Sequence, residues 1–142
     1  MADDYSPEVA FAKVVLATVI VVLAVYQALL MAVVYGKVPV PFLARRVASR
    51  THRIVGDTAA LLALFVAYFC VSGYEVGDAL EDGGRSAAHV LAGSAVLVVL
   101  AVKIFVVRRG GPRAGRFLPF LGVSVLGLFL LTWATSAVPR FG

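Results

Sequence analysis

The chain has 142 residues, 61% of them hydrophobic, and its mean hydropathy of +0.96 lies far above that of soluble globular domains. The formal net charge of +5 comes mainly from two short basic loops, so it indicates membrane topology and gives no reason to expect a nucleic-acid partner. Because Cys70 is the only cysteine, a disulfide framework and paired-thiol chemistry within one chain are excluded.

Apolar stretches long enough to cross a bilayer, which takes about 20 residues in a helix, occupy most of the sequence. They cover residues 9–35, 54–74, 87–107 and 117–138. The acidic start of the chain lacks the basic region of a signal peptide, so the first stretch is expected to remain as a helix. We therefore predict a single integral membrane domain over residues 1–142, an all-α four-helix transmembrane bundle with up-down-up-down topology.

Charged residues between these stretches predict the orientation of the bundle. The loops after the first and third stretches are basic, with Lys37, Arg45, Arg46, Arg50, Arg53, Arg108, Arg109, Arg113 and Arg116. The N-terminus and the loop after the second stretch are acidic. The positive-inside rule places both basic loops in the cytoplasm and both termini outside. Within the first basic loop, residues 42–50 are expected to form a short amphipathic segment on the membrane surface.

Two charged residues, Asp57 and Lys103, fall inside the predicted membrane helices, where an unpaired charge is costly. Asp57 lies near the cytoplasmic start of the second helix and Lys103 near the cytoplasmic end of the third, at similar depth. We expect them to form a structural ion pair, or Asp57 to pair with Arg53 one turn earlier while Lys103 extends toward the headgroups. A proton relay is the alternative, but it needs further titratable groups that the middle of the bundle does not supply.

The only histidines of the chain stand in the same pattern, His52-x-x-x-Gly56 and His89-x-x-x-Gly93. A histidine near a helix end can ligate haem iron, and a glycine one turn away on the same face leaves room for the flat macrocycle. The alternative interpretation is two polar residues at the membrane interface. The pattern therefore fits haem at His52, His89 or both, and it fits the interfacial alternative about equally well.

The predicted topology prevents both histidines from ligating one iron, because their helices begin at opposite faces of a bilayer core roughly 30 Å thick. The chain then holds two haems, one haem or none. Met31, in the inner half of the first helix, is the methionine placed to partner His52, and the arginines nearby can neutralise haem propionates. His52 is therefore the favoured ligand.

A resemblance to known proteins rests on Thr51–Gly56, on residues 67–70, Ala67-Tyr68-Phe69-Cys70, and on residues 88–93 around His89. These motifs resemble small four-helix membrane proteins of the cytochrome b561-like or ferric-reductase-like kind, and more closely an uncharacterised family from high-GC bacteria. The resemblance covers the chain from about Arg50 to the C-terminus. It implies b-type haem between transmembrane histidines, electron transfer, and a multi-pass protein of the bacterial cell (inner) membrane. Related sequences commonly carry histidine where this chain has Phe69, which cannot ligate iron.

Two functions follow as expectations. The first is a cytochrome b-like electron-transfer protein or subunit, with haem b and quinone as the candidate cofactors and quinol as an electron partner. The second is a haem-free anchor or accessory subunit of a larger respiratory or redox complex. Transport by a small multidrug exporter is a weaker alternative, because the first helix lacks a buried acid. The sequence shows no nucleophile, metal cluster or phosphate-binding loop, so an electron-transfer or structural subunit is more expected than a stand-alone enzyme.

Overall fold

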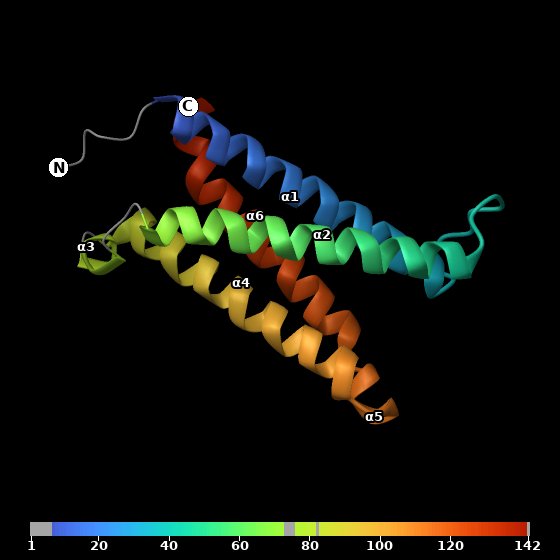
Figure 1. The fold of residues 1–142 in the computed structure, drawn as a ribbon. Coiled ribbons are helices and arrows are strands. Elements are labelled where there is room, and N and C mark those ends of the chain that lie inside the picture. Colours follow the sequence, from blue (N-terminus) through green and yellow to red (C-terminus); the bar gives the residue numbers. More distant parts are fainter. Residues whose placement is uncertain (1–6, 73–75, 82, 142) are drawn as a thin grey trace.

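The computed structural model describes residues 7–72, 76–81 and 83–141, and Figure 1 shows that these residues form helices joined by short connections. The helices are α1 (Pro7–Val34), α2 (Arg45–Ser72), α3 (Val76–Glu81), α4 (Gly84–Arg109), α5 (Pro112–Gly115) and α6 (Leu118–Phe141). Of these, α1, α2, α4 and the α5–α6 region are long and apolar enough to cross a membrane. The prediction of a four-helix membrane protein is confirmed.

The start of α2 differs from the prediction. The structure has one 28-residue helix from Arg45 to Ser72, in place of a separate amphipathic segment over 42–50 and a helix from residue 54. No proline or glycine lies between Pro41 and Gly56, so nothing in the sequence interrupts helical hydrogen bonding there. At about 1.5 Å per residue, α2 is roughly 42 Å long, which exceeds a bilayer core of roughly 30 Å. Its first turns therefore extend beyond the hydrocarbon.

Local sequence signals explain the other helix ends. α1 begins at Pro7, whose missing N–H removes one of the donors that stay unpaired at a helix start, and Glu8 places a negative charge in the first turn. α1 ends before Gly36, which adopts a φ of 70° and whose amide donates to the Val33 carbonyl at 3.0 Å. Prolines at 39 and 41 then keep the connection to α2 non-helical.

The helices pack as two antiparallel pairs, α1 with α2 and α4 with α6, which join mainly through α1 and α6. Figure 1 shows α2 and α4 diverging from the end that carries α3, and contacts between α2 and α4 are sparse. The main core cluster lies at mid-height and consists of Ile20, Ala24, Ala63, Val96, Val125 and Phe129. The packing therefore leaves α2 and α4 open toward each other at one end of the bundle.

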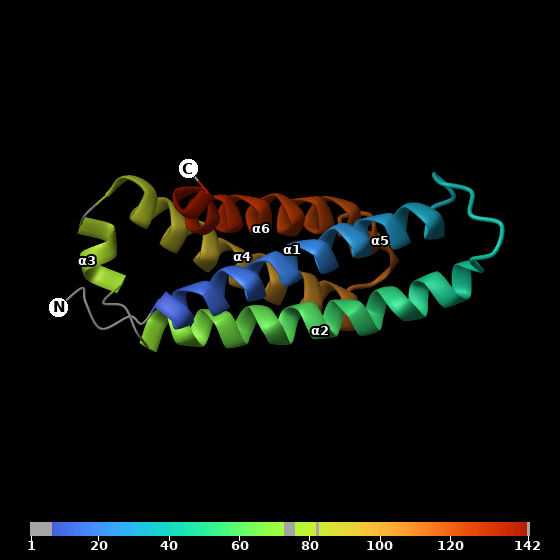
Figure 2. The same ribbon diagram turned by 90° about the horizontal axis from the view of Figure 1, so that it is seen from above.

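The two ends of the bundle differ in charge. α3, the beginning of α1 and the end of α6 lie at one end, which we call the acidic end because it carries Glu8, Asp78 and Glu81 (Figures 1 and 2). The α1–α2 connection and α5 lie at the opposite end, which we call the basic end. The alternating helix directions confirm the up-down-up-down arrangement. Which end faces the cytoplasm stays a prediction.

Large apolar side chains cover the outside of the bundle. Phe120 is 74% exposed, Val123 71% and Leu61 68%, and each lies on a candidate membrane span. Exposed apolar surface of this extent is what a hydrocarbon environment requires and water disfavours. The chain is therefore a multi-pass membrane protein whose outward surface contacts lipid.

Candidate functional site: two histidine clusters

The two histidines lie in separate clusters at opposite ends of the bundle, because each stands near the start of its helix and α2 and α4 start at opposite ends. His52 is in α2 near the basic end, and His89 is in α4 near the acidic end. Both imidazoles are partly buried. The two clusters differ in what packs against each histidine and against its glycine.

His52 on α2 has a neighbour on α1 and another on α4. The backbone carbonyl of Gln27 in α1 lies beside its ring, and Lys103 in α4 is close enough to act on it electrostatically. The Nδ1 atom of His52 is buried and makes no hydrogen bond. Buried polar atoms without a hydrogen bond are uncommon in folded proteins. The protein therefore meets only part of the hydrogen-bonding capacity of the His52 side chain.

The space created by Gly56 is occupied by Gln27. A Cβ atom placed on Gly56 would lie 3.5 Å from Oε1 and 3.7 Å from Nε2 of the Gln27 side chain, which is ordinary van der Waals contact. The amide of Gln27 therefore fills the position next to His52 that a macrocycle would need. The residues around His52 do not fit a haem as they are arranged.

The register of α1 and α2 places Met31 level with His52. Gln27 on α1 lies beside Gly56 on α2. Because the two helices are antiparallel, Met31 on α1 and His52 on α2 lie at the same height, one turn nearer the basic end. The sequence prediction had these two residues in the same half of the bundle. The same register brings buried alanines together, Ala24 in α1 with Ala59 and Ala63 in α2, so the two helix backbones approach closely just above the pair.

His89 has a different environment, because a hydrogen bond fixes its ring. Its Nδ1 lies 3.0 Å from Oγ1 of Thr135 in α6. The hydroxyl of Thr135 donates its own proton to backbone carbonyls, of Leu131 at 3.0 Å and of Thr132 at 2.9 Å. Since that single proton is already committed, Thr135 Oγ1 accepts from His89, and Nδ1 carries the ring proton. Nε2 is then the nitrogen with the free lone pair.

The surroundings of His89 also leave room and supply charge. A Cβ atom on Gly93 would meet nothing within 4 Å, so the space one turn deeper on α4 is open. The ammonium of Lys13, in α1, is close enough to act on the His89 ring. The acidic end thus combines a histidine with an oriented lone pair, an open position beside it and a nearby positive charge.

The predicted ion pair between Asp57 and Lys103 is not formed among the residues that the structure describes. Asp57 is exposed on α2, whereas Lys103 is partly buried on α4, where apolar burial dominates its surroundings. Lys103 lies near His52 instead. Asp57 follows His52 by five residues, which is about 140° around α2, so Asp57 and the His52 side chain near Lys103 lie on different sides of the helix.

One further polar contact joins the helix pairs. Trp133 Nε1 in α6 donates to Oγ1 of Thr18 in α1 at 2.9 Å, and Thr18 donates in turn to the Val14 carbonyl at 2.8 Å. The sequence showed Thr132, Trp133, Thr135 and Ser136 as a polar run near the end of the last helix. This polar run indicates that Thr135 has a polar partner, but its spacing does not identify His89 as that partner.

Comparison with known proteins places almost the whole chain in one family. Residues 4–142 match a family of unknown function, DUF6529. The chain belongs to the DUF6529 family. No curated protein and no solved structure matches the chain. Membership in DUF6529 agrees with the predicted resemblance to an uncharacterised family, and it shows no relationship to cytochrome b561-like or ferric-reductase-like proteins.

Proposed function

We propose that this DUF6529 protein is a membrane-embedded electron-transfer subunit that holds one b-type haem at its acidic end, with His89 as the axial ligand. The observation that carries the proposal is the hydrogen bond from His89 Nδ1–H to Thr135 Oγ1. Histidines that ligate metals usually donate their second ring N–H to a protein acceptor, which orients the ring and fixes the tautomer. At His89 this acceptor is a side chain bonded to Nδ1, whereas His52 has the Gln27 backbone beside its ring and an Nδ1 without a hydrogen bond.

The residues around His89 each have a defined part in this proposal. Thr135 holds the ring so that Nε2 presents its lone pair, and the open space at Gly93 admits a flat macrocycle beside the helix. Lys13 provides a positive charge for a propionate. The haem would supply one-electron chemistry when bound, for exchange with quinol or with a protein partner in a membrane redox complex.

The sequence favoured His52 as the haem ligand, and this proposal assigns His89 instead. That preference rested on Met31 and on nearby arginines. Met31 is level with His52 in the structure, yet Gln27 fills the position beside Gly56 and the α1–α2 backbones are held together by alanines. We therefore assign His52, Gln27 and Lys103 to contact between helices.

Absorption spectra of the purified protein and three variants test the proposal. We expect a Soret band that shifts on reduction, its loss in His89→Ala, and its retention in the matched control His52→Ala. Thr135→Val keeps the shape of the side chain but removes the acceptor, and should weaken haem binding about 10- to 100-fold, the range typical of such supporting groups. Absence of haem from the wild-type protein, or its loss in His52→Ala alone, would contradict the proposal.

A haem-free accessory subunit is the second candidate, and one observation favours it. His52 and Met31, the side chains that could complete an axial pair, lie away from the acidic end in the described part of the chain, and position 69 holds a phenylalanine. A second ligand for a haem held by His89 would therefore come from outside the described residues, for example from a partner protein. Stoichiometric co-purification with a membrane redox complex, without a Soret band assignable to this chain, would select the accessory-subunit function.

A further inference from the structure

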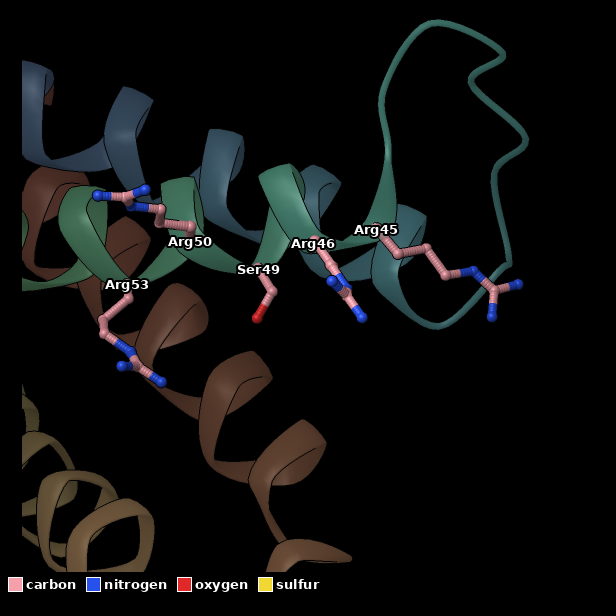
Figure 3. A pocket seen from close by; sticks show the side chains of 5 residues that line it. All are labelled: Arg45, Arg46, Ser49, Arg50 and Arg53. Atoms are coloured by element: carbon pink, nitrogen blue, oxygen red, sulfur yellow. The ribbon is translucent and has the colours of Figure 1, made fainter.

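The basic end carries a pocket on the first turns of α2 that neither histidine cluster uses. It has a volume of about 370 Å³ and is lined by Arg45, Arg46, Ser49, Arg50 and Arg53. Figure 3 shows that Arg46, Ser49 and Arg53 extend from the same side of the helix, as expected for residues three and four positions apart. Arg50 and Arg45 point away from that shared side, along the helix and toward the loop.

Arg45 closes the loop side of this arginine pocket. Its guanidinium lies against Gly36, since a Cβ atom added to Gly36 would come within 2.9 Å of Arg45 Nη2. Gly36 has a φ of 70°, so the turn after α1 brings its backbone toward the start of α2. Arg45 therefore contacts the connection, whereas all the residues that line the pocket belong to α2.

Negative charge to balance these guanidinium groups is scarce in the protein. Among the residues that the structure describes, none of the four arginines forms an ion pair with an acidic side chain. Asp57, one turn beyond Arg53, is the only acidic residue between residues 9 and 74 of the sequence, and it is exposed. Four clustered cations without internal counter-charges favour an anionic group from outside the chain.

The depth of the pocket indicates where that group comes from. α2 has 28 residues, and its apolar part follows Arg53. At about 1.5 Å per residue, the nine residues from Arg45 to Arg53 extend roughly 13 Å beyond the apolar part, into the layer of lipid headgroups. Phosphate groups of the bilayer lie in this layer, and arginine pairs with phosphate through two parallel hydrogen bonds.

We propose that the arginine pocket binds the phosphate group of an anionic membrane phospholipid. Arg46 and Arg53 donate hydrogen bonds to the phosphate from the same face of α2. Ser49, which lies between them, donates its hydroxyl, and Arg45 and Arg50 attract the headgroup by their charge. Binding at this position adds a lipid contact to the first turns of α2, which pack on α1 through Ala48 and lie where α2 and α4 diverge. The site is independent of haem and of His89.

Lipid binding measured by native mass spectrometry of the full-length protein tests this proposal, with phosphatidylglycerol as the probe and phosphatidylcholine as the zwitterionic comparison. The variant Arg46→Gln/Arg53→Gln removes two of the lining cations. A hydrogen bond between charged groups contributes roughly a tenfold change in affinity, so the loss of two such arginines should lower the affinity for phosphatidylglycerol roughly 100-fold. Arg46→Lys/Arg53→Lys keeps the charge but loses the paired hydrogen bonds, and should show a smaller loss.

The matched control is Arg108→Gln/Arg113→Gln, which removes the same charge from exposed positions at the basic end outside the pocket. Its affinity for phosphatidylglycerol should stay within about threefold of the wild-type value, since it leaves the lining residues intact. Equal losses in both glutamine variants would show diffuse surface attraction and overturn the site. Displacement of phosphatidylglycerol by millimolar inorganic phosphate, with direct binding of that ion, would assign the pocket to free phosphate and overturn the lipid proposal. Circular dichroism checks that each variant is folded.

Discussion

The hydrogen bond between Trp133 and Thr18 offers a quantitative test of how the two helix pairs are held together. The donor–acceptor distance of 2.9 Å is at the preferred value for N–H···O bonds. Thr18 already donates its proton to Val14, so its oxygen acts only as an acceptor toward the indole. The bond joins α1 to α6, the contact that unites the two antiparallel pairs.

We expect a coupling free energy of about 0.6 kcal/mol between Thr18 and Trp133, and at most about 1.7 kcal/mol, the range measured for side-chain hydrogen bonds in a membrane protein. A double-mutant cycle with Thr18→Val and Trp133→Phe isolates this value. The cycle is needed because Thr18 is exposed on a membrane helix, where valine also gains by burying an extra methyl in lipid. The single variant would therefore understate the hydrogen bond.

Unfolding by dodecyl sulfate in mixed micelles, followed by circular dichroism, provides the free energies for the cycle. Tryptophan fluorescence is unsuitable, because Trp133 is the only tryptophan and one variant removes it. A coupling below about 0.2 kcal/mol would refute the reasoning, because it would mean that the indole finds an equivalent partner when Thr18 is lost.

Two other predictions concern Gly56 and the orientation of the bundle. Gly56→Ala should change the free energy of unfolding by less than about 1 kcal/mol, because its Cβ would make only ordinary contact with Gln27, whereas Gly56→Leu should cost about 1–3 kcal/mol by displacing that side chain; equal unfolding midpoints for the two variants would contradict this. In a Cys70→Ala background, an impermeant thiol reagent added to intact cells should label Leu80→Cys and not Gly111→Cys, and the opposite pattern would reverse the predicted orientation.

The membrane helices could be predicted from hydropathy because each long apolar stretch has one stable state in a bilayer, a helix with its backbone groups paired. The start of α2 could not. The arginines at positions 45, 46, 50 and 53 indicated a separate surface segment, because a hydropathy profile identifies only the residues that are apolar enough to lie in the hydrocarbon. A helix continues past the hydrocarbon wherever no proline or glycine stops it, as happens here.

The contacts of the candidate sites depended on packing that the sequence does not display. Gln27 reaches Gly56 because small residues set the register and close approach of α1 and α2, among them Ala24, Ala59 and Ala63. Equal depth predicted a pair between Asp57 and Lys103, but depth along the membrane normal says nothing about lateral spacing. Asp57 is exposed on one side of α2, whereas Lys103 lies near His52, about 140° around the same helix.

The repeated His-x-x-x-Gly pattern shows why identical local sequence can serve different purposes. On both helices the glycine removes a side chain one turn from the histidine, which is a property of helical geometry alone. At Gly56 a side chain from α1 enters the vacated position, while nothing approaches the corresponding position at Gly93. Likewise, His89 has an acceptor on α6 that orients its ring, whereas the Nδ1 of His52 has no partner. Ligand chemistry therefore depends on the neighbouring helix at each site, and this difference is the reason to seek haem at the acidic end.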